Sequence, residues 1–144
     1  MFIKQLSIFI ENKVGRLQAI MDTLSENEIN IRALSIAETT EFGILRIITS
    51  DIEKAKKVLR DIDVISKITD VIAVYIDDKA GGLAKMLQAI TNAEINVEYM
   101  YAFLGGKTAE QAYMIFHVQD EGNAAFALVS KGITCINQED LAKL

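Results

Sequence analysis

This chain of 144 residues has few cysteines and histidines, the residue types on which disulfides, many metal sites and much catalysis depend. Cys135 is its one cysteine, so an intrachain disulfide and a cysteine-built zinc site are excluded. A lone thiol is typical of a reducing compartment, and we expect a cytoplasmic protein. His117 is the one histidine, and its position in a predicted strand favours a structural role.

Positive charge and long apolar runs are also scarce. Lys and Arg number 15 against 20 Asp and Glu, which gives a formal net charge of −5. Nucleic-acid-binding proteins usually carry a basic stripe, so we expect no nucleic-acid partner. The apolar runs are about four to six residues long, whereas a membrane-spanning helix needs about 20. The N-terminal apolar stretch alternates as a strand does and does not resemble a secretory signal, so we expect no membrane partner.

An internal repeat organises the sequence. Residues 11–31 and 77–97 align without a gap at an offset of 66 positions, and apolar residues recur in the same helical phase. The identical pairs are Lys13/Lys79, Gly15/Gly81, Leu17/Leu83, Glu28/Glu94, Ile29/Ile95 and Asn30/Asn96. We interpret the repeat as a duplication and predict two domains, residues 1–69 and 70–144.

Each repeat has the pattern of a β-α-β-β-α-β unit. Alternation predicts first strands at 6–10 and 72–76, and the spacing of Leu17, Ile20, Met21 and Leu24 predicts a helix with one apolar stripe. The second strand is predicted to start at 29–31, and the remaining predicted strands are 42–49, 64–68, 96–104, 112–118 and 132–136. The second helix of the first repeat is predicted to be capped by Ser50 or Asp51, and that of the second repeat covers 122–130. The predicted hairpin turns are at Thr39-Thr40 and, in a longer and looser form, at Gly105-Gly106. Thr69-Asp70 is predicted to be a short spacer between the repeats, and residues 137–144 to form one helical turn or fray.

Two helices with one apolar stripe each must lie on one face of an antiparallel sheet. The predicted fold class is therefore α+β, with two ferredoxin-like βαββαβ units, and the ferredoxin-like motif implies the strand order 4-1-3-2. On the opposite face, alternation places Phe9, Tyr75, Ile44, Ile48, Tyr113 and Ile115. A solvated face would be polar, so we expect a second copy to cover it in a homodimer; scattered surface hydrophobic residues are the alternative.

A catalytic constellation is missing from the sequence. Lys79 with Gly81-Gly82 lacks the Gly-Lys-Ser/Thr ending of a phosphate-binding loop. The acidic residues Glu11, Glu41 and Asp77-Asp78 fit solvated turns better than acid–base chemistry. We therefore predict that the protein is not an enzyme and has no cofactor and no metal.

The turn between the first strand and the first helix of each repeat is the strongest signal. It reads Asn12-Lys-Val-Gly15-Arg-Leu17 in one copy and Asp78-Lys-Ala-Gly81-Gly-Leu83 in the other. Glycine has no Cβ, so the backbone amides of the first helical turn stay accessible and favour an anion such as a carboxylate. Asn12 adds one donor and one acceptor. The alternative is that the glycines only permit a tight turn and close packing.

These motifs, followed by an apolar helix and Ile-Asn-Ile/Val, are similar to the signature of the ACT domain, a βαββαβ regulatory fold that usually binds amino acids. Tandem copies resemble the regulatory subunit of acetolactate synthase or separate amino-acid-binding regulators. The resemblance implies that the units pair side by side through their second strands in an eight-stranded sheet, with the effector between them. Its carboxylate would lie on the Gly15-side amides and its amine on Asn12, or on Asn30 or Asn96 across the seam. The ligand-binding residues so implied are Asn12, Val14, Gly15, Arg16, Leu17, Asn30, Ile31, Asp78, Ala80, Gly81, Gly82, Leu83, Asn96 and Val97.

The sequence departs from the family pattern in ways that make the two sites unequal. Val14 and Ala80 replace the usual proline, which loosens the loop. Asp78 stands where the first repeat has Asn12, and Gly82 where it has Arg16, so we expect the Asn12/Gly15 site, completed by Asn96, to bind better.

An effector without a catalytic domain on the chain would act by shifting an interface, with a second copy or with an enzyme or regulator of amino-acid metabolism. Two alternatives stay open. One is a regulatory or scaffolding subunit that works by protein contact and has vestigial ligand sites. The other is an RNA-binding ferredoxin-like module, which would need basic residues around Phe9, Tyr75 and Tyr113 and has few.

Overall fold

The computed structural model describes residues 2–38, 41–103 and 110–144. They fall into two compact units: a first unit, Lys4–Thr69, and a second unit, Asp70–Leu144, to which the N-terminal residues up to Ile3 also belong. The predicted hairpins at Thr39-Thr40 and Gly105-Gly106, and the predicted strand end at Leu104, lie outside the described residues.

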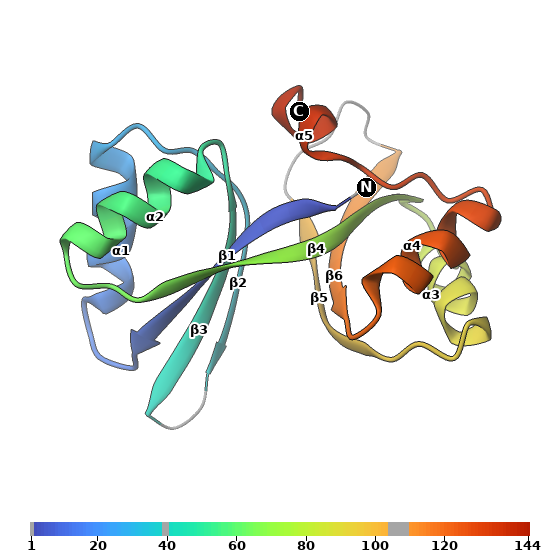
Figure 1. Ribbon diagram of the computed structural model, residues 1–144, viewed down its shortest axis with the longest axis horizontal. Helices are drawn as coiled ribbons and strands as arrows, with labels where there is room; N and C mark the ends of the chain where they lie inside the picture. Colours follow the sequence, from blue (N-terminus) through green and yellow to red (C-terminus); the bar gives the residue numbers. More distant parts are fainter. Residues whose placement is uncertain (1, 39–40, 104–109) are drawn as a thin grey trace. The chain divides into compact units, whose positions relative to one another are not determined.

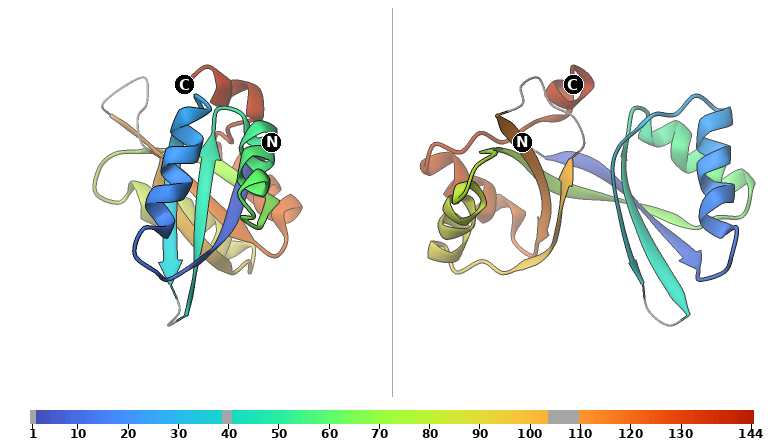
Figure 2. Two further views of the ribbon diagram at one scale, coloured as in Figure 1. Left: turned by 90° about the vertical axis from the view of Figure 1, so that its left-hand side faces the viewer. Right: turned by 180° about the vertical axis from the view of Figure 1, so that it is seen from behind.

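The first unit contains β1 (Ile3–Glu11), α1 (Arg16–Glu26), β2 (Ile31–Glu38), β3 (Phe42–Thr49), α2 (Ile52–Asp61) and the start of β4 (Ser66–Asp77). Strand β3 is antiparallel to both β1 and β2, with Leu6 opposite Ile47 and Ile36 opposite Leu45. Helices α1 and α2 cover one face of these strands (Figures 1 and 2). The strand order is the predicted 4-1-3-2.

The second unit continues with the rest of β4, then α3 (Gly82–Asn92), β5 (Val97–Phe103), β6 (Gln111–Val118), α4 (Glu121–Ser130) and α5 (Gln138–Ala142). Its predicted last strand at 132–136 is reduced to a bridge between Val74 and Cys135, flanked by two backbone hydrogen bonds. The Tyr75 N–H donates to the Thr134 carbonyl at 3.2 Å, and the Ile136 N–H donates to the Ala73 carbonyl at 2.7 Å. The tail forms α5, which Asn137 and Asp140 start with a capping box.

The junction between the repeats differs from the prediction. The strands predicted at 64–68 and 72–76 are one continuous strand, β4, and Thr69-Asp70 lies inside it. The named strands are hydrogen-bonded in the order β2-β3-β1-β4-β6-β5. The implied pairing of the second strands into eight strands is therefore wrong for the chain, since β2 and β5 end this order. The physical reason is that β4 runs through the junction without a break and pairs with strands of both repeats. Thr69 and Asp70 are therefore strand residues and not a spacer.

Each unit has its own hydrophobic core between helices and sheet. In the first unit Leu6, Ile8, Leu45 and Leu24 are buried together, and in the second Ile72, Val74, Phe116 and Leu128 are among the corresponding residues. Each fully buried side chain of this size contributes about 1.5–3 kcal/mol. The α+β fold class predicted from the two periodicities is confirmed.

The first apolar residue of each predicted helical stripe lies outside these cores. Leu17 and Leu83 are each 38% exposed, whereas Ile20 and Leu24 are buried. Both leucines lie in the first turn of their helix, at the end where the chain leaves the sheet.

The sheet face opposite the helices is only partly exposed. Ile48, Tyr113 and Ile115 are buried, whereas Phe9 is 49% exposed. The Tyr113 ring packs edge-on against Tyr75, with ring centroids 4.5 Å apart. Cover by a second copy stays a prediction.

Candidate functional site

Helices α1 and α3 begin in a way that differs from the other helices. Asp51 caps α2 and Asp120 caps α4, each by accepting a backbone N–H at 3.1 Å. By contrast, α1 starts at Gly15 (φ 87°) and α3 at Gly81 (φ 89°), and no side chain caps either helix. A φ in this range favours glycine, because a Cβ would be strained there.

The uncapped starts leave backbone donors without helical partners. The first N–H groups of a helix have no carbonyl four residues earlier within the helix. Here the Arg16 N–H is taken by the Lys13 carbonyl at 3.2 Å, and the Gly82 N–H by the Lys79 carbonyl at 3.0 Å. The next donors, on Leu17 and Leu83, lie at the positive end of the helix dipole, where a carboxylate is stabilised.

The charges around the first start form a small cluster. The Glu11 Oε2 lies 3.0 Å from Lys13 Nζ and 3.5 Å from an Arg16 guanidinium nitrogen. The hydrogen bond from Lys13, with the charges of Lys13 and Arg16, lowers the pKa of Glu11. The second start retains one pair, Lys79 with Asp77 at 3.6 Å, so it has one positive side chain fewer.

The second repeat has Gly82 at the position of Arg16, and this difference has a steric cause. A Cβ built on Gly82 would overlap the carbonyl oxygen of Asp77 at the end of β4. No larger residue fits there without moving backbone. The structure therefore gives Gly82 a packing role in addition to any binding role.

The residues predicted for the sites fall into two separate groups within each unit. The Asn12 N–H donates to the Glu41 carbonyl at 3.1 Å, beside the first residue of β3. The Asn30 N–H donates to Ser50 Oγ at 3.0 Å, just beyond the last residue of β3. Strand β3 therefore separates Asn12 from Asn30 within the first unit.

The same separation occurs in the second unit. The Asp78 N–H donates to the Glu110 carbonyl at one end of β6, and Val97 pairs with Val118 at the other end. The turn groups are Asn12, Val14, Gly15, Arg16 and Leu17, and Asp78, Ala80, Gly81, Gly82 and Leu83; the strand-start groups are Asn30 and Ile31, and Asn96 and Val97. That Asn96 completes the binding site at Asn12 and Gly15 stays a prediction.

A cleft of about 690 Å³, which the sequence did not reveal, opens beside the start of α1. The end of β1 supplies Phe9, Ile10 and Glu11, and β3 supplies Phe42. Helix α1 supplies Arg16, Ala19, Ile20 and Thr23, and the turn after α2 supplies residues 62–65. Only Arg16 among the predicted site residues lines it. The signal available in the sequence was a set of hydrophobic residues, Phe9, Phe42, Ile62 and Ile65, that the helix and strand patterns did not place in the core.

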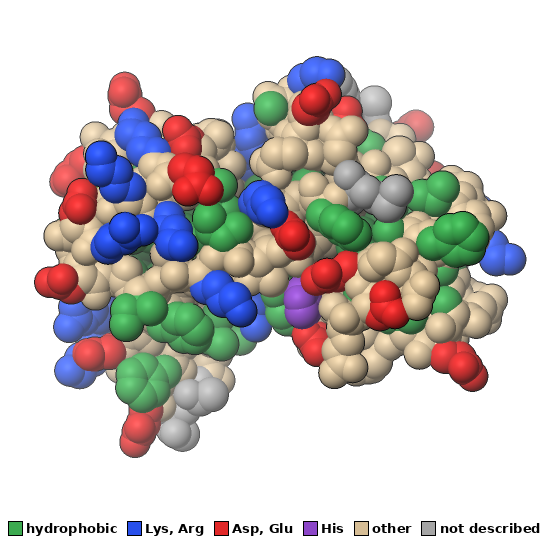
Figure 3. Space-filling model, in the orientation of Figure 1, with side chains coloured by type: hydrophobic (Ala, Val, Ile, Leu, Met, Phe, Trp, Pro, Cys, Tyr) green, Lys and Arg blue, Asp and Glu red, His purple; other side chains and the backbone are tan. Residues whose placement is uncertain are grey.

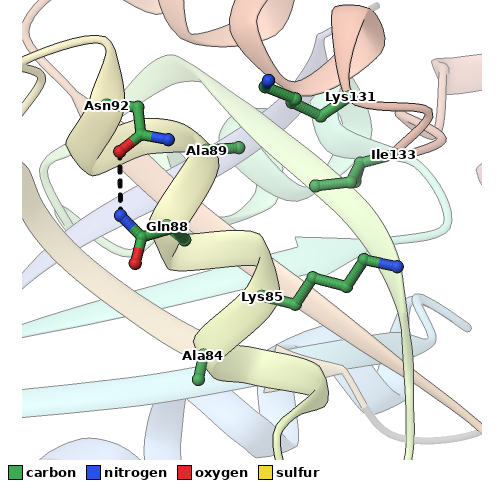
Figure 4. Close-up of a pocket in the computed structure, with 7 residues that line it drawn as sticks. All are labelled: Ala84, Lys85, Gln88, Ala89, Asn92, Lys131 and Ile133. Atoms are coloured by element: carbon green, nitrogen blue, oxygen red, sulfur yellow. Dashed lines mark hydrogen bonds between the residues drawn. The ribbon is translucent and has the colours of Figure 1, made fainter.

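The second unit has a cleft of about 250 Å³ at the corresponding place. It is lined by Tyr75, Ile76 and Asp77, by Gly82, Lys85 and Met86, by Gln111, and by residues 131–134. Lys85 and Lys131 also line a neighbouring cleft of about 500 Å³, where Gln88 donates a hydrogen bond to Asn92 at 2.8 Å (Figure 4).

His117 and Cys135 have surroundings that agree with structural roles. His117 Nδ1 lies 2.6 Å from Glu98 Oε2 and its Nε2 lies 3.3 Å from Glu121 Oε1, so both ring nitrogens have partners. Tyr99 stacks on the ring at 5.2 Å, and Figure 3 shows the histidine among acidic side chains. Burial raises the pKa of the Cys135 thiol. Within residues 2–38, 41–103 and 110–144, no group of three or more metal-ligating side chains occurs.

The two α+β units with their repeated helix starts define a tandem ferredoxin-like protein. The sequence matches the ACT domain pair over residues 1–144, so the chain belongs to the ACT domain pair family, whose fold is typical of amino-acid-binding regulatory modules. The resemblance seen in the turn motifs is thereby confirmed. Among the described residues, no helix is both long and apolar enough to span a membrane.

Solved structures agree with this assignment. Protein BT0572 from Bacteroides thetaiotaomicron is 38% identical, with a TM-score of 0.91, and the match covers 100% of this chain and 98% of that one. The regulatory subunits of aspartate kinase from Thermus thermophilus and Thermus flavus are 14% and 15% identical, with TM-scores of 0.63 and 0.60. Their matches cover 88% of this chain and 91% and 90% of theirs, and show a common fold. A search of curated proteins gives no match.

Proposed function

We propose that this protein is a non-enzymatic regulator that binds a free amino acid at the start of α1. One observation supports this most strongly: the same uncapped start at a left-handed glycine occurs in both repeats of an ACT domain pair, whereas α2 and α4 carry side-chain caps. An uncapped helix start with accessible amides is a site for a carboxylate.

The surroundings supply partners for both ends of a zwitterion. The carboxylate would accept from the Leu17 amide and from Arg16, and the ammonium group would bind Asn12 or Glu11. In the second unit Asp78 replaces Asn12 and would repel a carboxylate, so the first site is the stronger one. A ligand of about 8–12 heavy atoms binds with roughly −5 to −7 kcal/mol, or a Kd of about 10 µM to 0.2 mM.

Binding would act through an interface, because a regulator needs a partner whose contacts differ between the two states. We propose a homodimer, and an enzyme or regulator of amino-acid metabolism as a further partner. The Thermus proteins of the same fold are regulatory subunits of aspartate kinase.

A thermal-shift panel of the twenty amino acids tests the proposal. At about 100 times Kd, a ligand should raise the melting temperature by about 5–10 °C, and only selected amino acids should do so. Calorimetry on Asn12→Ala should then show weaker binding. Asn27→Ala is the control, since its side chain bonds the Thr23 carbonyl at the other end of α1. If no amino acid changes the melting temperature, the chain acts by protein contact alone.

A further inference from the structure

The two repeats carry clefts at the same place in the fold, and the clefts differ in chemistry. Both lie between the first helix, the end of the first strand and the turn after the second helix. Phe9 corresponds to Tyr75 and Ile20 to Met86, so much of the lining is of the same kind. The volumes, about 690 Å³ and 250 Å³, show that the first cleft is the larger one.

The first cleft is apolar over most of its wall. Phe9, Phe42, Ile62 and Ile65 line it, although they are 49%, 55%, 44% and 73% exposed. Large side chains gathered around one concavity, rather than scattered, are typical of a surface that binds something. The volume lies within the range of about 300–1,000 Å³ that small-molecule pockets have.

The same cleft is lined by one cationic side chain, Arg16, and by two carboxylates, Glu11 and Asp63. Glu11 and Arg16 both line it and face one another at 3.5 Å. A free amino acid can take over this pair, with its carboxylate on the Arg16 guanidinium and its ammonium group on Glu11. An apolar compound without charges would leave the pair unused, whereas an amino acid uses both the rim and the wall.

The second cleft lacks this combination. Lys85 stands where the first unit has Ala19, and Lys131 where it has Ile62. Figure 4 shows Lys85 and Lys131 on the same side of α3. Gly82 also removes the guanidinium at the rim. A large apolar ligand would have to cover the exposed Lys85 and Lys131 side chains, which costs free energy, so the second cleft is less suited to such a ligand than the first.

We infer that the cleft of the first unit receives the effector's side chain, and that the effector is an amino acid with a large aliphatic or aromatic side chain. This inference rests on the proposed function and specifies its ligand. Ala19 and Ile62 are then the residues that determine specificity.

Exchange of residues between the repeats tests the inference. Ala19→Lys and Ile62→Lys introduce the lysines of the second cleft at exposed positions of the first, where folding tolerates them. Each should weaken binding of leucine, isoleucine, methionine or phenylalanine by about tenfold or more in calorimetry. Ser25→Lys, an exposed position of α1 that does not line the cleft, should leave the affinity unchanged. Circular dichroism of each variant establishes that it is folded.

The outcomes separate this inference from the proposed function. Binding of large apolar amino acids that is lost in both cleft variants and kept in Ser25→Lys supports the inference. Preference for small, polar or charged amino acids, or apolar binding that both variants retain, overturns the inference and leaves the proposed function standing. Absence of binding by any of the twenty amino acids overturns both.

Discussion

The carbonyl oxygen of Asp77 occupies the space that a Cβ on Gly82 would need. The end of β4 and the start of α3 therefore approach more closely than the corresponding elements of the first unit, where Arg16 stands. One backbone contact thus limits which side chains the second helix start can present.

Substitution of Gly82 by alanine should destabilise the protein. The new Cβ meets backbone atoms, which cannot move as a flexible side chain would, so we expect a loss of about 1–3 kcal/mol in the free energy of unfolding. Urea titration measures it. Gly122→Ala in α4 is the matched control: its Cβ meets only Asp120 Oδ1 at 3.9 Å, and the helix should gain about 0.5–1 kcal/mol. Equal effects of the two substitutions would contradict the steric explanation.

Glu28 and Glu94 should tolerate glycine with a gain in stability. They follow α1 and α3 with φ values of 57° and 58°, in the left-handed region. Here the Ile29 N–H bonds the Leu24 carbonyl at 2.9 Å, and the Ile95 N–H bonds the Ile90 carbonyl at 3.2 Å. Glycine has no Cβ to strain at such a helix end, so each replacement should add about 0.5–1 kcal/mol.

Thermal unfolding of Glu28→Gly and Glu94→Gly checks this. A glycine in the middle of an exposed helix face, Lys57→Gly in α2, should instead cost about 1 kcal/mol. A loss of stability in all three variants would mean that the left-handed conformation carries no strain at Glu28 and Glu94.

The pKa of Glu11 should respond to Lys13. Because Lys13 and Arg16 hold this pKa below the ordinary value of a glutamate, the carboxylate interactions stabilise the fold above that ordinary value and are lost as the pH falls through the folded-state pKa. In Lys13→Ala, NMR titration of the Glu11 carboxyl should show a higher pKa, with Arg16 retaining part of the effect. Lys57→Ala should leave the titration unchanged, and an identical curve for Lys13→Ala would refute the assignment.

The thiol of Cys135 should react slowly in the folded protein. Burial raises its pKa above the ordinary value, so little thiolate forms near pH 8. Since the folded-state pKa is the higher one, this contribution to stability is present at neutral pH and is lost as the pH rises through it. Modification by a chromogenic disulfide should be much faster in urea than in buffer; equal rates would show that the thiol is accessible.

Local patterns were sufficient for much of the fold. The apolar stripe predicted for α1 is buried at Ile20 and Leu24, and the helices α1 and α3 start at Gly15 and Gly81. Both features could be predicted because capping and amphipathicity depend on neighbours within a few residues. The predicted cap of α2 is confirmed at Asp51. The role of Gly82 could not be predicted, since its neighbour Asp77 constrains it only through folded backbone geometry.

The sequence alone determined the duplication, the βαββαβ pattern and the glycine at each helix start, because each depends on residues close together along the chain. Only the tertiary structure decided that β4 serves both repeats, that Asn12 and Asn30 lie at opposite ends of β3, and that Phe9, Arg16 and Ile62 line one cleft. Those relations depend on hydrogen bonds and packing between segments distant in sequence, for which local periodicity holds no information.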